Sequence, residues 1–137
     1  MSRLAEEYGL IVTLDPKPVL NWSGSGAHTN FSTKQMRDDN GIVEIEKAIY
    51  KLARAHLKHI KVYDPHGGKD NVRRCHGTFN APGLNEFTTG VGDRACSVRI
   101  PRIVHEARKG HLEDRRPSSN SDPYAVVTAL LRTCILN

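Results

Sequence analysis

The stretch Asn21–Ser32 reads NWSGSGAHTNFS and changes character halfway along its length. Its first half is rich in small residues, and the two glycines lack a Cβ, so a ligand or another backbone segment can come close to the main chain there. Its second half alternates as a strand does, which puts His28, Asn30 and Ser32 on one face. A glycine-rich turn that leads into such a strand is typical of a site for a charged small molecule, although an ordinary hairpin has the same pattern.

The composition of the 137 residues indicates a single globular domain with a positive charge. The net charge of +5 and the isoelectric point near 9.3 favour anionic partners: nucleotide phosphates, nucleic acid or an acidic neighbouring domain. No apolar run approaches the roughly 20 residues that cross a bilayer, and no secretory signal follows Met1, so we expect a cytoplasmic protein with no membrane partner. The scattered cysteines Cys75, Cys96 and Cys134 suit a reducing compartment and lack the spacing of a zinc site.

Periodicity and end signals predict helices and strands along the whole chain. Apolar residues recur every three or four positions over Ile42–Ile60, which predicts a helix with one buried face. Asp122 followed by Pro123 predicts the start of a second helix, over Tyr124–Leu136, that is apolar nearly all round and should be buried. The predicted strands cover residues 10–14, 91–100 and 111–113 and the second half of 21–33, and a helical turn covers 2–8.

Two further features concern the organisation of the chain. Residues 69–89 show no periodicity and contain Gly77, Pro82 and Gly83, so we expect a long functional loop there. The short helix at residues 2–8 and the apolar helix near Asn137 both look incomplete, which predicts that the chain is a piece of something larger.

Arginines are the first candidate binding residues. A guanidinium binds carboxylate or phosphate through parallel N–H donors, so a convergent group could neutralise a nucleotide triphosphate and an amino-acid carboxylate, whereas a solvated basic surface gives the same composition. Strict alternation along 91–100 would put Arg94 and Arg99 on opposite faces, so one of them must lie beyond the strand or across a bulge. The arginines in question are Arg73, Arg74, Arg94, Arg99, Arg102, Arg115 and Arg116.

Glu113 and His28 are the candidate metal ligands. Together they supply one oxygen and one nitrogen, a plausible half-site for Mg²⁺ or Mn²⁺. The alternative is that Glu113 pairs with Arg115 or Arg116. His56 and His59 are three residues apart on the predicted helix and could also bind a metal, but helix histidines are more often solvated or packed.

Several motifs in order give the chain a family resemblance. Together with NWSGSGAHTNFS, which comes first in the chain, these motifs resemble those of the eukaryotic-type glutamine synthetases in order and spacing. The resemblance covers essentially the whole chain. It implies that residues 1–137 correspond to the C-terminal portion of the catalytic domain, without the N-terminal domain and the early catalytic domain. The implied fold is α+β, with a curved antiparallel sheet backed by helices. The motifs are DP at 64–65, DNVRR at 70–74, Arg94, SVRIPR at 97–102, GHLEDRRP at 110–117 and DPY at 122–124.

The resemblance also implies an activity and roles for individual residues. The family joins ammonia to L-glutamate with ATP through a γ-glutamyl phosphate, uses Mg²⁺ or Mn²⁺, and forms homo-oligomers with sites at subunit interfaces. Carried over to this sequence, His28 and Glu113 would hold the metal, and Arg94 and Arg99 would stabilise the transferred phosphoryl group. Glutamate would be bound by Asn21, Trp22, Gly24, Arg74, Arg94 and Arg115. ATP would be bound by Asn30, Phe31, Ser32, Arg94, Arg99, His111, Leu112 and Glu113.

The sequence departs from the family where a mobile loop follows Arg74. Relatives carry there a glutamate that shields the intermediate and helps to deprotonate ammonium, and the aligned residue here is Asn80, which cannot accept a proton. In addition, His111 stands where relatives usually have tyrosine, and one glycine is absent before Asn21. These departures leave a second interpretation open, a catalytically degenerate relative that keeps nucleotide or oligomer-interface binding. A nucleic-acid-binding module is disfavoured, because aromatic residues make up only 6% of the chain and no stacking platform is visible.

Overall fold

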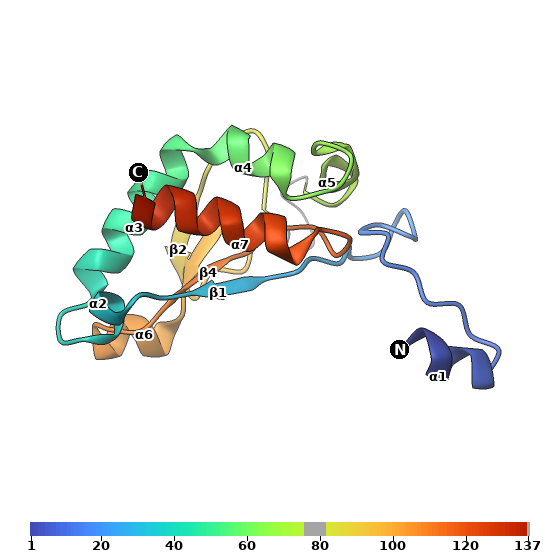
Figure 1. The fold of residues 1–137 in the computed structure, drawn as a ribbon, viewed down its shortest axis with the longest axis horizontal. Helices are drawn as coiled ribbons and strands as arrows, with labels where there is room; N and C mark the ends of the chain where they lie inside the picture. The colour runs from blue at the N-terminus through green and yellow to red at the C-terminus, as the bar shows by residue number, and fades with distance from the viewer. Residues whose placement is uncertain (76–81, 137) are drawn as a thin grey trace.

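A computed structural model describes residues 1–75 and 82–136, which form helices packed on one small sheet (Figure 1). The helices are α1 (Ser2–Glu7), α2 (Lys34–Arg37), α3 (Ile42–Arg54), α4 (His56–Val62), α5 (Lys69–Arg74), α6 (Arg102–Ala107), α7 (Pro123–Leu131) and the π-helical turn η1 (Arg132–Leu136). The strands are β1 (Thr29–Phe31), β2 (Thr89–Val91), β3 (Val98–Ile100) and β4 (Leu112–Asp114). None of the described helices is both long and apolar enough to cross a membrane.

The four strands form one sheet in the order β1-β4-β3-β2. β4 pairs antiparallel with both β1 and β3, which confirms the predicted antiparallel pairing for these three strands. β2 joins the edge parallel to β3, so the sheet is mixed rather than purely antiparallel. The combination of helices with a mostly antiparallel sheet confirms the α+β class.

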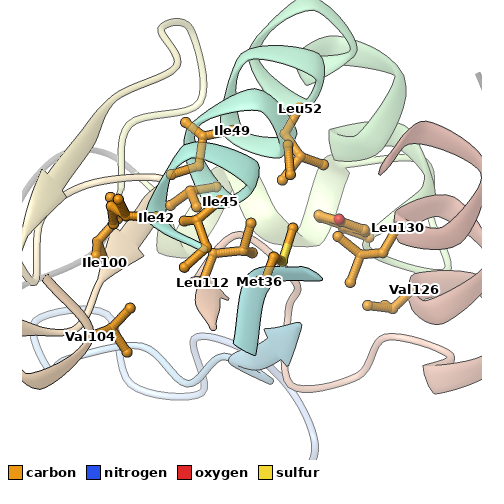
Figure 2. Close-up of a cluster of buried hydrophobic side chains, with 13 residues drawn as sticks. Met36, Ile42, Ile45, Ile49, Leu52, Ile100, Val104, Leu112, Val126 and Leu130 are labelled. Atoms are coloured by element: carbon orange, nitrogen blue, oxygen red, sulfur yellow. The ribbon is translucent and has the colours of Figure 1, made fainter. Parts of the chain in front are cut away.

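One hydrophobic core joins the helices to the sheet (Figure 2). Ile45 and Leu52 project from α3, Leu112 from the middle of the sheet, and Leu130 from α7, and all four are almost completely buried. Met36 from α2 fills the space between them. The core therefore lies between one face of the sheet and the helices α3 and α7.

The predicted helix Ile42–Ile60 is confirmed in its buried face and interrupted at one residue. Every position of its predicted apolar stripe is buried, including His56 and Ile60 near its end. Ala55 has φ −97° and ψ 10°, so it ends α3 and precedes α4. The break separates two helical segments without moving the buried face out of the core.

The predicted strand at residues 10–14 is wrong. These residues form no strand, and Leu10, Ile11 and Leu14 are 65%, 95% and 64% exposed. Figure 1 shows the N-terminal segment lying apart from the body of the molecule. The preference of Ile and Val for extended backbone is mostly a preference for packing in a sheet, and no described strand lies beside them.

The predicted strand 91–100 is also wrong, because it is divided into β2 and β3. Gly92 has φ +66° and turns the chain, and the Asp93 carboxylate accepts a hydrogen bond of 2.8 Å from the backbone N–H of Ala95. The chain thus leaves the sheet after Val91 and returns at Val98.

Two other expectations need correction. The expected loop over 69–89 contains the helix α5. The sequence also shows no sign of the short helices α2 and α6, because they contain too few residues for a helical period to be visible. The second correction concerns the terminal helix, which was expected to be buried. Asp122 does cap α7 by accepting from the backbone N–H of Tyr124, but only one side of the helix is buried: Val126 and Leu130 lie in the core, whereas Tyr124 is 82% exposed.

Candidate functional site

The sheet face opposite the core carries a row of polar residues. Asn30 on β1 and Arg99 on β3 are both register partners of Glu113 on the central strand β4. Directly opposed residues of neighbouring strands project to the same face, so these three side chains share one side of the sheet. The residues that flank Glu113, Leu112 and Asp114, project to the opposite side and are completely buried.

Glu113 is the centre of this polar face. One carboxylate oxygen lies 3.1 Å from His28 Nδ1 and 3.4 Å from Arg115 Nη1, and the other forms an ion pair with Arg99 Nε. The Glu113 side chain is only 8% exposed, so its carboxylate is largely shielded from water, whereas the His28 side chain is 38% exposed. Arg115 also donates to the backbone carbonyl of Arg94, with an Nη2–O distance of 2.6 Å. The predicted pairing of Glu113 with Arg115 is confirmed, and Arg99 is an additional partner.

His28 is held in the form that can bind a metal. Burial and the positive charge of Arg115 lower the pKa of His28 below its usual value, although Glu113 acts in the opposite direction. The imidazole is therefore neutral at pH 7 and keeps a lone pair. A neutral imidazole nitrogen and a carboxylate oxygen fit Mn²⁺ or Mg²⁺ as two ligands of a larger set.

The Arg74 side chain packs directly against the main chain of Gly24 and Gly26, where no Cβ is present. A Cβ on Gly24 would lie 2.5 Å from Arg74 Cγ, and a Cβ on Gly26 would lie 2.9 Å from Arg74 Nη1. Arg74 is 3% exposed, and its guanidinium donates to Asn71 Oδ1 at 3.1 Å and to the carbonyl of Arg116 at 2.9 Å. Burial lowers the pKa of this guanidinium. In this structure Arg74 thus joins the glycine loop to the end of β4.

The other residues with expected glutamate-binding roles lie on loops around the polar face. Trp22 is 71% exposed, and its carbonyl accepts a hydrogen bond from the buried Lys17 Nζ; Asn21 beside it is exposed as well. Arg94 has an exposed side chain in the turn between β2 and β3. This agrees with the expectation that Arg94 or Arg99 lies outside a regular strand.

The residues with expected ATP-binding roles divide between the two sides of the sheet. Asn30 is exposed on the polar face, and the Ser32 hydroxyl accepts a 2.7 Å hydrogen bond from Arg37. His111 is half-buried just before β4. Phe31 packs against the core and Leu112 lies inside it. Asn80, at the position of the family's loop glutamate, lies outside the described residues.

A buried polar network lies beneath the site, and the sequence motifs did not predict it. The ion pair between Arg116 Nη2 and Asp114 Oδ2 measures 2.7 Å with both side chains inaccessible to water. The Tyr63 hydroxyl donates to Asp114 Oδ2 at 2.7 Å, and His59 Nδ1 lies 2.6 Å from the same hydroxyl. His56 Nδ1 lies 3.1 Å from Arg116 Nη1. Both helix histidines are therefore packed in the protein interior, in contacts with other side chains.

The pKa values of this network follow from burial and from one strong pair. Burial lowers the pKa of His59 to about 4, so His59 is neutral at pH 7. Burial alone would raise the pKa of Asp114, but Arg116 and the Tyr63 hydroxyl outweigh it and leave that pKa below its usual value. The sequence does contain one signal for the buried network. In EDRR at 113–116, strand alternation assigns successive charged residues to opposite faces, so two of the four should face the interior.

Comparison with curated proteins finds glutamine synthetases. No family model matches the chain. The whole chain is 59% identical over 138 residues to glutamine synthetase 1, mitochondrial, of Drosophila melanogaster, and 53% identical to the glutamine synthetase of Homo sapiens. It covers 35% and 37% of these relatives, so it spans little more than a third of their length.

Solved structures agree on the fold. The structure of apo GmaS without ligand matches 98% of the chain with a TM-score of 0.71 and 25% identity, and the chain covers 31% of it. The cryo-EM structure of Plasmodium falciparum glutamine synthetase matches 97% of the chain with a TM-score of 0.73 and 19% identity, with 27% of that chain covered. Over its whole length, this chain is therefore a relative of the glutamine synthetases, and it corresponds to the C-terminal part of their subunit.

Proposed function

We propose that this chain carries part of a site for the ATP-dependent ligation of ammonia to L-glutamate, which gives L-glutamine through a γ-glutamyl phosphate. The observation that carries the proposal is the position of Glu113, which lies with His28, Arg99 and Arg115 on one face of the sheet. Carboxylate, neutral imidazole and guanidinium groups in one place are what a metal–nucleotide complex requires. The high identity to proteins named glutamine synthetase supports the same assignment.

His28 and Glu113 would hold Mg²⁺ or Mn²⁺ as two ligands of a larger set. When bound, the metal would neutralise phosphate charge and orient the phosphates of ATP. Arg99 pairs with Glu113 through Nε in this structure, and its Nη groups would donate to a phosphate oxygen. Arg115 is fixed by its hydrogen bond to the Arg94 carbonyl, and its positive charge would stabilise developing negative charge.

The substrates would meet the chain along the same face. Asn21 and Trp22 on the exposed loop, together with Arg115, would contact glutamate, and Asn30 and the Arg94 side chain would contact ATP. We infer a homo-oligomer with sites at subunit interfaces, in keeping with the family resemblance. The relatives include a mitochondrial and a cytoplasmic form, so a cytoplasmic location stays a prediction for this chain.

Metal binding is the direct test of the site. Mn²⁺ added to the purified chain, with ATP present, should bind, and its bound fraction can be measured by electron paramagnetic resonance. Glu113→Gln should weaken binding at least tenfold, because it removes an anionic ligand. Glu106→Gln on the exposed surface of α6 is the matched control and should bind as the unaltered chain does. Equal binding by the Glu113 and Glu106 variants would refute the site.

Glutamine formation separates the ligase from the degenerate relative. The chain is incubated with MgATP, glutamate and ammonium, and glutamine is measured directly. In a longer form of the chain, binding with turnover supports the ligase, whereas binding without turnover favours the second interpretation, for which Asn80 is the argument. We expect negligible turnover by the 137-residue chain alone. If Asn80 limits a longer form, Asn80→Glu should raise its rate, and an unchanged rate would remove Asn80 as the explanation.

A further inference from the structure

A cavity lies between α4 and α7, on the helical side of the molecule. The two helices run beside each other in Figure 1 and contact each other in the structure. The cavity has a volume of about 340 Å³, near the lower end of the range for small-molecule sites. Its walls include Lys58 and Val62 from α4, Ala125, Thr128 and Ala129 from α7, and Arg132 from η1.

The cavity exists because the side chains at this helix contact are small. Ala125, Thr128 and Ala129 recur at three- and four-residue steps, so they line one side of α7 and leave space against Val62. An unfilled apolar space forgoes the dispersion contacts that a packed helix pair would make. The lining therefore offers an apolar surface to a molecule that enters.

A rare backbone conformation forms one end of the cavity. Residues Arg132–Leu136 form a π-helical turn that continues α7. Such turns are uncommon and occur frequently at functional sites. This turn brings Arg132 and Thr133 into the cavity wall, where the Thr133 hydroxyl lies 2.8 Å from His59 Nε2. The polar groups of the inner wall thus already contact each other.

The charges around the cavity are all positive. Lys58 and Arg132 are exposed, and neither forms an ion pair with a carboxylate among residues 1–75 and 82–136. No acidic residue belongs to the described lining. His59 is neutral at pH 7, since burial lowers its pKa to about 4, so the lysine and the arginine carry the charge. An anion would find two cations here without competing with a carboxylate.

We propose that the cavity between α4 and α7 binds a small organic anion with an apolar body, such as a carboxylate on an alkyl chain. The anionic group is bound by Lys58 and Arg132, and the apolar body lies against Val62, Ala125 and Ala129. Tyr124 beside the cavity is 82% exposed and can cover the bound molecule with its ring. The proposal does not depend on the proposed function, because the cavity lies on the helices and the polar face lies on the other side of the sheet.

Octanoate is a suitable probe, and octan-1-ol is the matched neutral molecule. Binding of each to the purified chain is measured by titration with NMR detection, and ligands of this size bind with dissociation constants on the order of 1 mM. Octanoate should bind about tenfold more tightly than octan-1-ol, because charged hydrogen bonds add to the apolar contact. Equal affinities would mean that the cations play no part and would overturn the proposal.

Three variants locate the binding site. Lys58→Ala and Arg132→Ala should each weaken octanoate binding about fivefold and leave octan-1-ol unchanged, since both positions are exposed. Lys61→Ala, also exposed on α4 but outside the cavity lining, is the control and should have no effect. Ala125→Leu should abolish binding of both molecules by filling the cavity. If octanoate binding is unchanged in Lys58→Ala, Arg132→Ala and Ala125→Leu, the octanoate site lies elsewhere and the proposal is overturned.

Discussion

Arg116→Met should strongly destabilise the fold, because it leaves Asp114 as a buried charge without a cation. In the structure Arg116 Nε and Nη2 donate to the two Asp114 oxygens at 2.8 and 2.7 Å, and neither side chain is exposed. Removing one partner of such a pair costs about 3–5 kcal/mol. A small domain has a total stability of only about 5–15 kcal/mol, so the loss would be a large fraction of it. Methionine retains much of the side-chain volume, so packing contributes little to the change.

The pH dependence of the stability loss shows whether the buried Asp114 charge causes it. The folded chain holds the pKa of Asp114 below its unfolded value, so this stabilisation is present above the unfolded pKa of about 3.9 and is lost as pH falls through the folded pKa. In the Arg116→Met chain, burial without a cation should instead raise the folded pKa above the unfolded one. Protonation would then relieve the buried charge, and the difference in stability between the two chains should shrink as pH falls from 7 towards 5.

Urea unfolding followed by circular dichroism measures this free energy. Arg3→Met, in the exposed helix α1, is the matched control and should change the free energy of unfolding by less than about 0.5 kcal/mol. Adding Asp114→Asn to Arg116→Met should recover part of the loss, because the uncompensated charge is gone. A loss below about 1 kcal/mol for Arg116→Met, or a loss that does not vary with pH, would refute the reasoning.

Two further substitutions test the packing that positions the site. Gly24→Ala should lower the free energy of unfolding by about 1–3 kcal/mol, because the new Cβ would lie 2.5 Å from Arg74 Cγ. Gly83→Ala is the control, since its Cβ would meet nothing within 4 Å. Equal effects of the two substitutions would contradict the close contact between Gly24 and Arg74. Leu52→Ala should lower the free energy of unfolding by about 2–5 kcal/mol, because it leaves a cavity in the core. Leu57→Ala, at a position 65% exposed, should change the free energy of unfolding little. Similar losses for the two substitutions would show that Leu52 is not in a rigid core.

The sequence predicted best those elements that have a long regular period. The stripe from Ile42 to Leu52 repeats over three turns, so it identified a helix and its buried side correctly. The end of α3 at Ala55 could not be predicted, because alanine favours helix and the break depends on packing. Residues 10–14 show the opposite case: their composition favours a strand, but a strand forms only where another strand lies beside it.

The candidate site was predictable in its chemistry and only partly in its geometry. The pairing of β1 with β4 brings His28 within 3.1 Å of Glu113, as the proposed half-site requires. The ion pair with Arg99 was not anticipated, because it depends on β3 lying next to β4. The burial of Arg74 was not anticipated either, since nothing in an RR pair shows which arginine turns inward.

Strand β4 imposes a pattern on the natural variation of residues 112–116. Glu113 faces the candidate site and Asp114 the interior, and the arginines that follow them divide in the same way. Changes at alternate positions would therefore differ in kind: those facing the site would alter its charge and its ligands, and those facing inward would alter the network that joins the sheet to the helices. An inherited change in this segment could be assigned to one of the two classes from whether its position is odd or even.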